Sequence, residues 1–198
     1  MAKPSSDQFS RRAFLKGSSA VAAASAVVTS AAAQEKSAQS SQVIAGETTV
    51  SLNVNGKSMT AKVEPRTTLL DVLRYQFNLT GAKPVSSDGS SGASTVLIDN
   101  RPVEAAVTLA LSAVGKNIQT VESLAGDAVP KAFMQYDASQ CGFCTPGFVV
   151  AVRAFLNRNP NATEEQIRAG LNGNICRCGT YANILQAAIS IAKGGQNG

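Results

Sequence analysis

The four cysteines of the chain lie in its last third as two close pairs. Cys141 and Cys144 form a C-x2-C pair, Cys176 and Cys178 form a C-x-C pair, and 31 residues separate the two pairs. Thiolates are soft metal ligands, and four of them make up the usual ligand set of a structural zinc ion or an iron-sulfur cluster. The cysteines therefore predict a metal centre.

Each pair runs directly into a segment with helical periodicity. Thr145 and Pro146 are typical N-cap and first-turn residues for the apolar pattern over 148–156, and a second apolar pattern covers 184–192. At the N-terminus of a helix, free N–H groups and the dipole lower thiolate pKa values and favour an anionic centre. Small residues beside the ligands are expected to let the backbone approach and donate N–H bonds to sulfur: Gly142, Gly147 and Gly179.

Ligand chemistry leaves three interpretations of the thiols. Disulfides are the ordinary state in an oxidising compartment, but a C-x-C pair is poorly suited to an internal bridge. Structural zinc also takes four thiolates, although its common signature is two C-x2-C pairs. An iron-sulfur cluster is the third interpretation.

Composition argues against acid-base catalysis by this chain. Its 198 residues contain no histidine, the commonest general base and proton shuttle. The apolar fraction of 44% suits a globular core, which is aliphatic because only 5% of residues are aromatic. We expect no catalytic residue in the chain.

The first 33 residues are expected to be a twin-arginine signal peptide. Residues 10–16 read S-R-R-A-F-L-K, and an uncharged Ala/Val-rich run follows over 18–33, ending in small residues that suit cleavage after Ala33. The run is too short and too Ala-rich for a stable membrane span. A periplasmic location is therefore expected, and the alternative is a disordered basic tail. The twin-arginine pathway carries folded proteins, so thiols can meet their metal before export.

The charge of the mature chain gives nucleic-acid binding no electrostatic support. Residues 1–33 hold four of the 18 basic and one of the 13 acidic residues, so the formal charge falls from +5 to +2 without them. Residues 34–46 have the composition of a linker.

Residues 47–124 predict a small α+β domain of the β-grasp type. Alternating apolar residues over 48–63 flank Asn55-Gly56, a strong hairpin signal. Thr67 or Thr68 is expected to cap a following helix, with Asp71 returning a capping-box bond. After a Gly/Ser-rich loop over 81–94, strands are predicted at 95–98 and 118–121, with a turn at 99–100.

Residues 125–194 predict a four-helix domain. Helices are expected over 129–138, 146–158, from a capping box at 163–166 to about Leu171, and over 181–193. This arrangement brings the two cysteine pairs together at one end.

The complete string Q-C-G-F-C-T-P-G followed by G-N-I-C-R-C-G closely resembles the small iron-sulfur subunit of the molybdenum hydroxylases, the family of xanthine dehydrogenase, aldehyde oxidoreductase and isoquinoline oxidoreductase. The resemblance covers about residues 48–193. It implies a ferredoxin-like first domain and a helical second domain that binds a 2Fe-2S cluster through C-x2-C and C-x-C. It therefore favours the iron-sulfur interpretation of Cys141, Cys144, Cys176 and Cys178.

The first domain of that family binds another 2Fe-2S cluster through C-x4-C-x2-C and a distant fourth cysteine. Here the matching segment, residues 81–100, reads G-A-K-P-V-S-S-D-G-S-S-G-A-S-T-V-L-I-D-N. By spacing, the ligand positions hold Ser86, Ser91, Ser94 and Ala106. A serine hydroxyl is far less acidic than a thiol and a poor iron ligand, and alanine cannot ligate. We expect the first cluster to be lost, leaving a former cluster loop rather than an ordinary flexible Ser/Gly loop.

The resemblance implies an electron-transfer subunit of a molybdenum hydroxylase that oxidises aldehydes or N-heterocycles. Its partner is a large molybdopterin-binding subunit, whose cofactor contacts the positions of Gln140 and Cys178; an ordinary solvated side chain is the alternative for Gln140. Because the first cluster is missing, a c-type cytochrome or other periplasmic acceptor is expected to dock nearer the remaining cluster. The rival hypotheses are a structural pseudo-subunit, a zinc-binding interaction module and an assembly factor.

Overall fold

The structure is a computed structural model that describes residues 45–194. The predicted signal peptide, 1–33, and nearly all of the predicted linker, 34–46, lie outside the described residues. The described residues fall within one compact unit, Ile44–Gly198.

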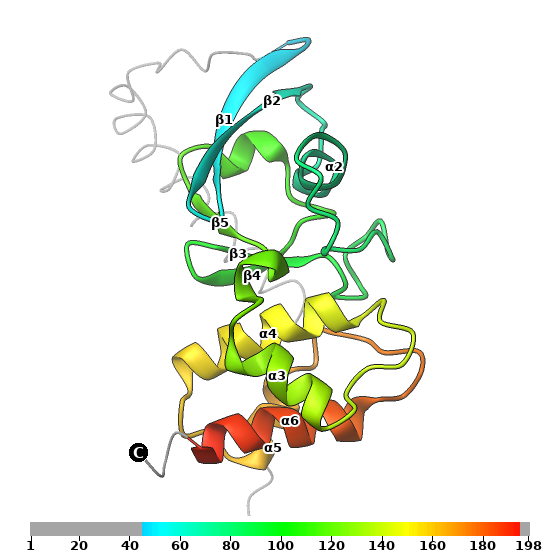
Figure 1. Ribbon diagram of the computed structural model, residues 1–198. Coiled ribbons are helices and arrows are strands. Elements are labelled where there is room, and N and C mark those ends of the chain that lie inside the picture. The colour runs from blue at the N-terminus through cyan, green and yellow to red at the C-terminus, as the bar shows by residue number, and fades with distance from the viewer. Residues whose placement is uncertain (1–44, 195–198) are drawn as a thin grey trace, which may run out of the picture. The chain divides into compact units, whose positions relative to one another are not determined.

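The N-terminal part of this unit is a five-stranded mixed sheet in the order β2-β1-β5-β3-β4 (Figure 1). Its strands are β1 (Thr48–Val54), β2 (Lys57–Val63), β3 (Thr95–Ile98), β4 (Arg101–Glu104) and β5 (Asn117–Gln119). β1 and β5 are parallel, and the other neighbours are antiparallel. Together with the helices that follow, this sheet confirms the expected α+β class.

The predicted hairpin is confirmed. Asn55 and Gly56 have positive φ values of 53° and 76°, as a tight hairpin turn between β1 and β2 requires. Val50 pairs with Ala61 and Leu52 with Met59 across the hairpin. The alternation works as expected, because Leu52, Val54, Ala61 and Val63 are buried.

The first helix differs from its predicted form. Thr68 is the N-cap of α2 (Leu69–Asp71), which continues as a π-helical turn, η1 (Val72–Gln76). The Thr68 hydroxyl accepts a bond from the Asp71 N–H at 3.1 Å and donates to the Asp71 carboxylate at 2.7 Å. The carboxylate of Asp71 is therefore occupied by the Thr68 hydroxyl rather than by the Thr68 backbone N–H.

Two strands at the sheet edge and centre also differ from expectation. β4 was not predicted, since it is short, exposed and contains Pro102, which suits an edge strand only. β5 ends at Gln119, and Val121 already belongs to the 3-10 turn η3 (Val121–Leu124). Another 3-10 turn, η2 (Ala110–Ala113), precedes β5. The turn at Asp99-Asn100 is confirmed, with φ values of 49° and 62°.

The C-terminal part consists of α3 (Ala128–Gln135), α4 (Thr145–Arg158), α5 (Glu164–Gly170) and α6 (Tyr181–Gly194) (Figure 1). The capping box of α5 is present as predicted, between Thr163 and Gln166. The predicted N-cap of α4 is wrong by one residue: Cys144 is the N-cap, and Thr145 begins the helix. The Thr145 hydroxyl bonds instead to the Ser139 hydroxyl at 2.8 Å.

Helix α4 joins the sheet to the other helices. One core cluster fills the space between the sheet and α2, and a second lies among α3, α4, α5 and α6. A third, small cluster links β3 to α4 through Leu97, Val150 and Ala154. The face of α4 away from the helical core thus packs against the sheet, and this packing connects the N-terminal and C-terminal parts.

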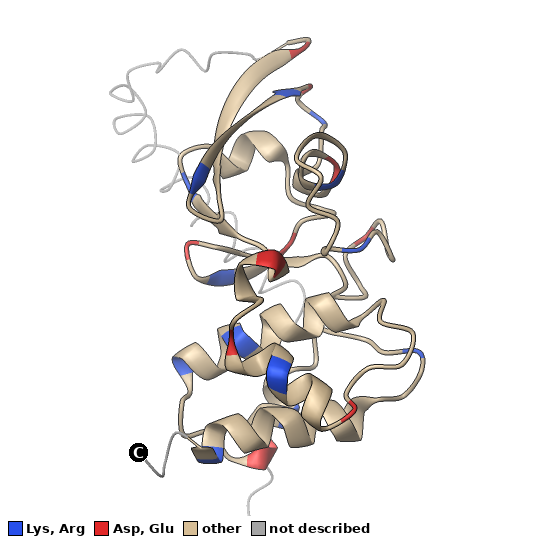
Figure 2. Ribbon diagram, in the orientation of Figure 1, with Lys and Arg blue, Asp and Glu red and all other residues tan. Residues whose placement is uncertain are grey.

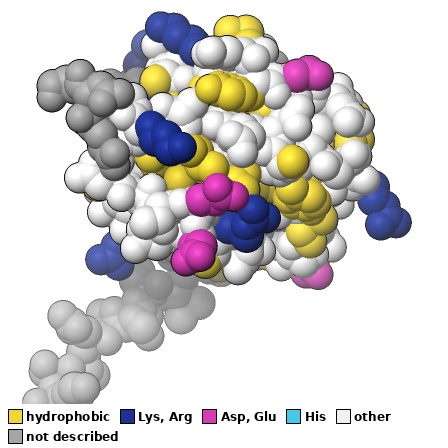
Figure 3. Space-filling view, turned by 90° about the horizontal axis from the view of Figure 1, so that it is seen from below, with side chains coloured by type: hydrophobic (Ala, Val, Ile, Leu, Met, Phe, Trp, Pro, Cys, Tyr) yellow, Lys and Arg dark blue, Asp and Glu magenta, His cyan; other side chains and the backbone are white. Residues whose placement is uncertain are grey.

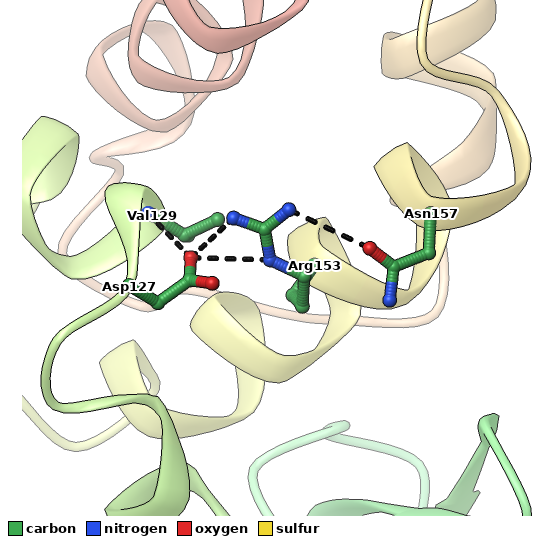
Figure 4. Close-up of polar contacts among 4 residues, drawn as sticks. All are labelled: Asp127, Val129, Arg153 and Asn157. Carbon is green, nitrogen blue, oxygen red and sulfur yellow. Dashed lines mark hydrogen bonds and ion pairs between the residues drawn. The ribbon is translucent and has the colours of Figure 1, made fainter.

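An ion pair fixes α3 against α4 (Figure 4). The Asp127 carboxylate caps α3 by accepting the Val129 N–H at 2.8 Å, and it also accepts from the Arg153 guanidinium on α4. Arg153 in turn reaches Asn157 at 3.5 Å. One carboxylate therefore both starts α3 and sets its position on α4.

The surface shows no segregation of charge among the described residues. Basic and acidic side chains are scattered over sheet and helices (Figure 2), and the face seen in Figure 3 mixes both signs with small hydrophobic areas. Within residues 45–194, no helix is long and apolar enough to cross a membrane.

Candidate metal centre

The two cysteine pairs come from the starts of α4 and α6. Cys144 is the N-cap of α4, and Cys141 lies three residues before it. Cys176 and Cys178 lie in the loop that leads into α6 at Tyr181. The expectation that both pairs lie at helix N-termini is confirmed.

The four thiols meet in two pairs across this junction. The thiol of Cys141 interacts with that of Cys178, and the thiol of Cys144 interacts with that of Cys176. Charge interaction between Cys141 and Cys176 links the two pairs. The two cysteine pairs, which 31 residues separate in the sequence, thus approach one another, and all four thiols are free of disulfide bonds.

Burial divides the cluster into an inner and an outer side. Cys176 is only 6% exposed and belongs to the helical core, and Cys144 is partly buried beside it. Cys141 and Cys178 are exposed. The inner side is shielded from water, and the outer side can be reached by a partner.

The pKa values follow this division. A hydrogen bond from the backbone N–H of Phe143 lowers the pKa of the exposed Cys141, whereas burial raises the pKa of Cys144 to about 12. Burial also opposes ionisation of Cys176, but bonds from the Thr180 hydroxyl and N–H overcome it and lower the pKa of Cys176 to about 7. For Cys178, the Cys141 backbone N–H favours the thiolate, yet the neighbouring Cys141 thiol and burial leave its pKa raised.

Two side chains that the sequence analysis did not assign hold Cys176. The Thr180 hydroxyl lies 3.2 Å from the Cys176 Sγ, and the Cys176 N–H donates to the Tyr181 hydroxyl at 2.7 Å. Thr180 is 5% exposed, so its hydroxyl needs this internal partner. The position of Thr180 directly before the last predicted helix was the one sequence feature that pointed to a role beside the cysteines.

Of the glycine N–H bonds to sulfur that the sequence predicts, one from Gly179 to Cys176 is found among the described residues. Gly142 and Gly179 directly follow the exposed cysteines and have φ values of 81° and 83°, so the chain turns sharply after each ligand. Gly147 lies elsewhere. A side chain there would meet the carbonyl oxygen of Gly92 at 2.2 Å, which places Gly147 at a contact with the loop over 81–94.

The donor set fits a 2Fe-2S cluster. In such a cluster four thiolates hold two irons, and the four free thiols at this junction would supply that ligand set. Within residues 45–194, no group of three or more Cys, His, Asp or Glu side chains is already arranged to hold a metal ion, so the assignment rests on the type and number of the donors. Cys141, Cys144, Cys176 and Cys178 are the residues that would hold the cluster.

Three large apolar side chains close to the cysteines in the sequence are exposed. Phe143, Ile175 and Tyr181 are 55%, 54% and 47% exposed, respectively, and each lies within three residues of a cysteine. Gln140, directly before Cys141, is exposed as well.

The Gly/Ser-rich loop over 81–94, here called the serine loop, carries no thiol, but the four predicted ligand positions approach one another in two pairs. The hydroxyls of Ser86 and Ser91 lie 2.8 Å apart, and the Ala106 N–H donates to the Ser94 hydroxyl at 3.2 Å. Ser94 is buried and donates to Glu104 at 2.7 Å. Hydroxyl and backbone bonds therefore occupy the place that the family resemblance assigns to a second set of ligands.

The comparisons with known proteins agree with this geometry. A [2Fe-2S] binding domain model matches residues 120–189. The small FeS subunit of nicotinate dehydrogenase from Eubacterium barkeri is 40% identical over 148 residues, which are 73% of this chain and 94% of that subunit. The chain belongs to the small iron-sulfur subunits of the molybdenum hydroxylases.

Other members of the family support this placement. The aldehyde oxidoreductase iron-sulfur-binding subunit of Escherichia coli is 40% identical over 164 residues, covering 73% of this chain and 71% of that subunit. In the crystal structure of quinoline 2-oxidoreductase from Pseudomonas putida, a chain with 37% identity superposes with a TM-score of 0.71, covering 77% of this chain and 98% of that one. As an iron-sulfur subunit, the chain takes a 2Fe-2S cluster, and its molybdenum hydroxylase partner carries molybdopterin.

Proposed function

We propose that the chain is the electron-transfer subunit of a periplasmic molybdenum hydroxylase that oxidises an aldehyde or an N-heterocycle. Substrate oxidation is assigned to the large molybdopterin subunit, because this chain has no histidine to act as a general base. A bound 2Fe-2S cluster supplies one-electron acceptance and release. The observation that carries the proposal is the meeting of the two cysteine pairs at the starts of α4 and α6.

The burial of the thiols supports two different roles for the two sides of the centre. Cys144 and Cys176, backed by the helical core, anchor the centre and exclude water from it. Cys141 and Cys178 lie on the exposed side, together with Gln140. We assign Gln140 and Cys178 to the contact with molybdopterin, and the exposed Phe143, Ile175 and Tyr181 to the surface that binds the large subunit.

The same proposal includes the domain organisation. Residues 47–124 form a β-grasp domain of ferredoxin type that has lost its ligands, and residues 125–194 form a four-helix 2Fe-2S-binding domain. The separate core clusters of the two segments support this division. With thiols in the second domain only, the electron acceptor, a c-type cytochrome or another periplasmic protein, docks near that domain.

Iron and acid-labile sulfide analysis of the chain co-purified with its large subunit tests the function. We expect about two irons and two sulfides per chain, and one 2Fe-2S signal in electron paramagnetic resonance (EPR) of the reduced complex. A Cys176→Ser variant should lose this signal. About four irons per chain would contradict the one-cluster proposal, and a folded, iron-free complex would favour a structural subunit.

Export is tested separately. The periplasmic location rests on the S-R-R-A-F-L-K segment, so replacing Arg11 and Arg12 together by lysine should leave the protein in the cytoplasm. Fractionation of cells that express the two forms, with a cytoplasmic and a periplasmic marker, measures this. Unchanged periplasmic recovery of the double variant would contradict the twin-arginine route.

A further inference from the structure

The serine loop lies directly on the backbone that precedes Cys176. The Ile175 N–H donates to the carbonyl oxygen of Ser91 at 2.9 Å. The side-chain amide of Asn174 donates to the carbonyl oxygen of Gly92 at 2.8 Å and reaches the Thr95 hydroxyl at 3.4 Å. The serine loop, which belongs to the sheet-containing part, thus holds the two residues immediately before Cys176.

This contact is too close to tolerate side chains at its glycines. Gly92 has a φ of 69°, and a Cβ there would lie 2.5 Å from both the Asn174 side-chain nitrogen and the Gly173 carbonyl oxygen. On the other side, a Cβ at Gly147 of α4 would lie 2.2 Å from the Gly92 carbonyl oxygen. Such separations are below van der Waals contact, so the loop is wedged between α4 and the Cys176 segment.

The serine hydroxyls give the loop its shape at this contact. The Ser86 hydroxyl accepts the Ser91 N–H at 3.1 Å and bonds to the Ser91 hydroxyl at 2.8 Å, and the Ala93 N–H donates to the Ser91 hydroxyl at 3.4 Å. These bonds fix the peptide groups on both sides of the Ser91 carbonyl. That carbonyl is the acceptor for Ile175.

We propose that Ser86 and Ser91 are positioning residues for the metal centre: through the Ser91 and Gly92 carbonyls they fix Ile175 and Asn174, and thereby the place of Cys176. On this view the serine loop holds no metal itself but supports the segment of the helical part that carries Cys176. The inference rests on the proposed cluster at Cys141, Cys144, Cys176 and Cys178. It adds that the stability and the spectroscopic properties of this cluster depend on hydroxyls with no bond to it.

The test compares the holo-complex carrying Ser86→Ala, Asn174→Ala, both changes, or the control Ser90→Ala. Ser90 lies in the same loop and is exposed, and its hydroxyl donates to the Asp88 carboxylate at 2.7 Å. Three quantities are measured: the rate of iron loss to a chelator, the EPR spectrum of the reduced complex and its midpoint potential. Circular dichroism verifies the fold of each variant.

For Ser86→Ala and Asn174→Ala we expect iron loss to accelerate roughly threefold to tenfold, as the loss of one or two hydrogen bonds gives, with altered EPR g-values. The double variant should lose iron no faster than the product of the single effects, because both act on one contact. Ser86→Thr, which keeps the hydroxyl, should restore the wild-type rate, and Ser90→Ala should match wild type.

Lower melting temperatures with unchanged iron loss, EPR spectrum and potential would overturn the inference, since a purely structural loop would give that result. If Ser86→Ala does not fold, Asn174→Ala tests the same contact from the helical side, and its wild-type behaviour would equally overturn it. A wild-type complex without iron would contradict the proposed function. The positioning role would then fall as well, because it depends on the cluster.

Discussion

Thr180 shows how one side chain sets the environment of a metal ligand. Its hydroxyl lies 3.2 Å from the Cys176 Sγ in a place with 5% exposure for Thr180 and 6% for Cys176. In such surroundings a donor to sulfur has no competing water, and it stabilises negative charge on the sulfur. Hydrogen bonds to sulfur are among the factors that set iron-sulfur potentials.

Thr180→Val should therefore lower the midpoint potential of the centre. Valine keeps the shape of threonine and removes the donor, so the reduced, more negative state loses more stabilisation. A net hydrogen bond of about 0.5–1.5 kcal/mol corresponds to about 20–60 mV for one electron. A redox titration followed by EPR measures the shift, and Thr180→Ser is the control that keeps the donor. An unchanged potential in Thr180→Val would show that the hydroxyl does not reach the sulfur.

The apo-chain should show unequal thiol reactivity. Thiolates are the reactive species, so alkylation of the exposed Cys141 should reach half its maximal rate below pH 9.0, the ordinary thiol pKa, and that of Cys178 above it. Cys144, with its pKa raised to about 12, should react slowest at neutral pH, and burial should protect Cys176. Mass spectrometry of iodoacetamide-treated apo-chain gives the rates, with urea-unfolded chain as control. Equal rates in the folded apo-chain would contradict this division.

For single residues, the sequence predicts the metal ligands better than the residues that hydrogen-bond to them and hold them in place. The four cysteines are identified by residue type and spacing, which need no coordinates. Thr180, Tyr181 and Asn174 are ordinary polar residues, and their roles depend on how α6 and the serine loop fold back. Contacts such as that of Asn174 with Gly92, 82 residues away in the chain, leave no periodic signal.

Among the elements, α4 links the two parts, and the Asp127–Arg153 pair sets its angle to α3 (Figure 4). Both side chains are largely buried, with 23% and 20% exposure, so water screens the pair less than a surface pair. Asp127 also caps α3. Substitutions at Asp127 can therefore separate its role as the cap of α3 from its role as the ionic partner of Arg153.

Asp127→Asn should lower the free energy of unfolding by about 1–2 kcal/mol, since asparagine still caps the helix but leaves Arg153 without its ionic partner. Asp127→Ala should cost about 1 kcal/mol more, because the cap is lost too. Urea unfolding of the chain measures both. Glu164→Gln, which removes an exposed pair with Arg168, is the control and should change little. Equal losses for the two Asp127 variants would show that the cap contributes nothing.

Elements with strong local signals follow the sequence closely, and those determined by distant contacts do not. The β1–β2 hairpin and the capping box of α5 need only local chemistry. Strand β4 has a proline and exposed residues, and it forms because β3 offers its edge. The π-helical turn after α2 likewise has no signature in the pattern of apolar residues over 69–77, which fits an ordinary helix.

At the scale of the whole molecule, the four cysteines of the helical part can be compared with the four positions that the family resemblance identifies as ligands in the sheet-containing part. The helical part holds four thiols, whereas in the serine loop Ser86 lies against Ser91 and Ser94 lies against the backbone of Ala106. The positions that the family resemblance identifies as ligands therefore still approach one another two by two.

Restoring cysteine at Ser86, Ser91, Ser94 and Ala106 together should rebuild a second cluster, because ligand type rather than loop geometry is what this site lacks. We expect iron to rise from about two to about four per chain, with a second EPR signal in the reduced protein. The matched control places one cysteine at the exposed Ser87 instead of Ser86, which keeps the number of thiols and breaks the spacing. If the correctly spaced variant binds no more iron than this control, the hydroxyl network has changed the loop beyond what thiols alone can reverse.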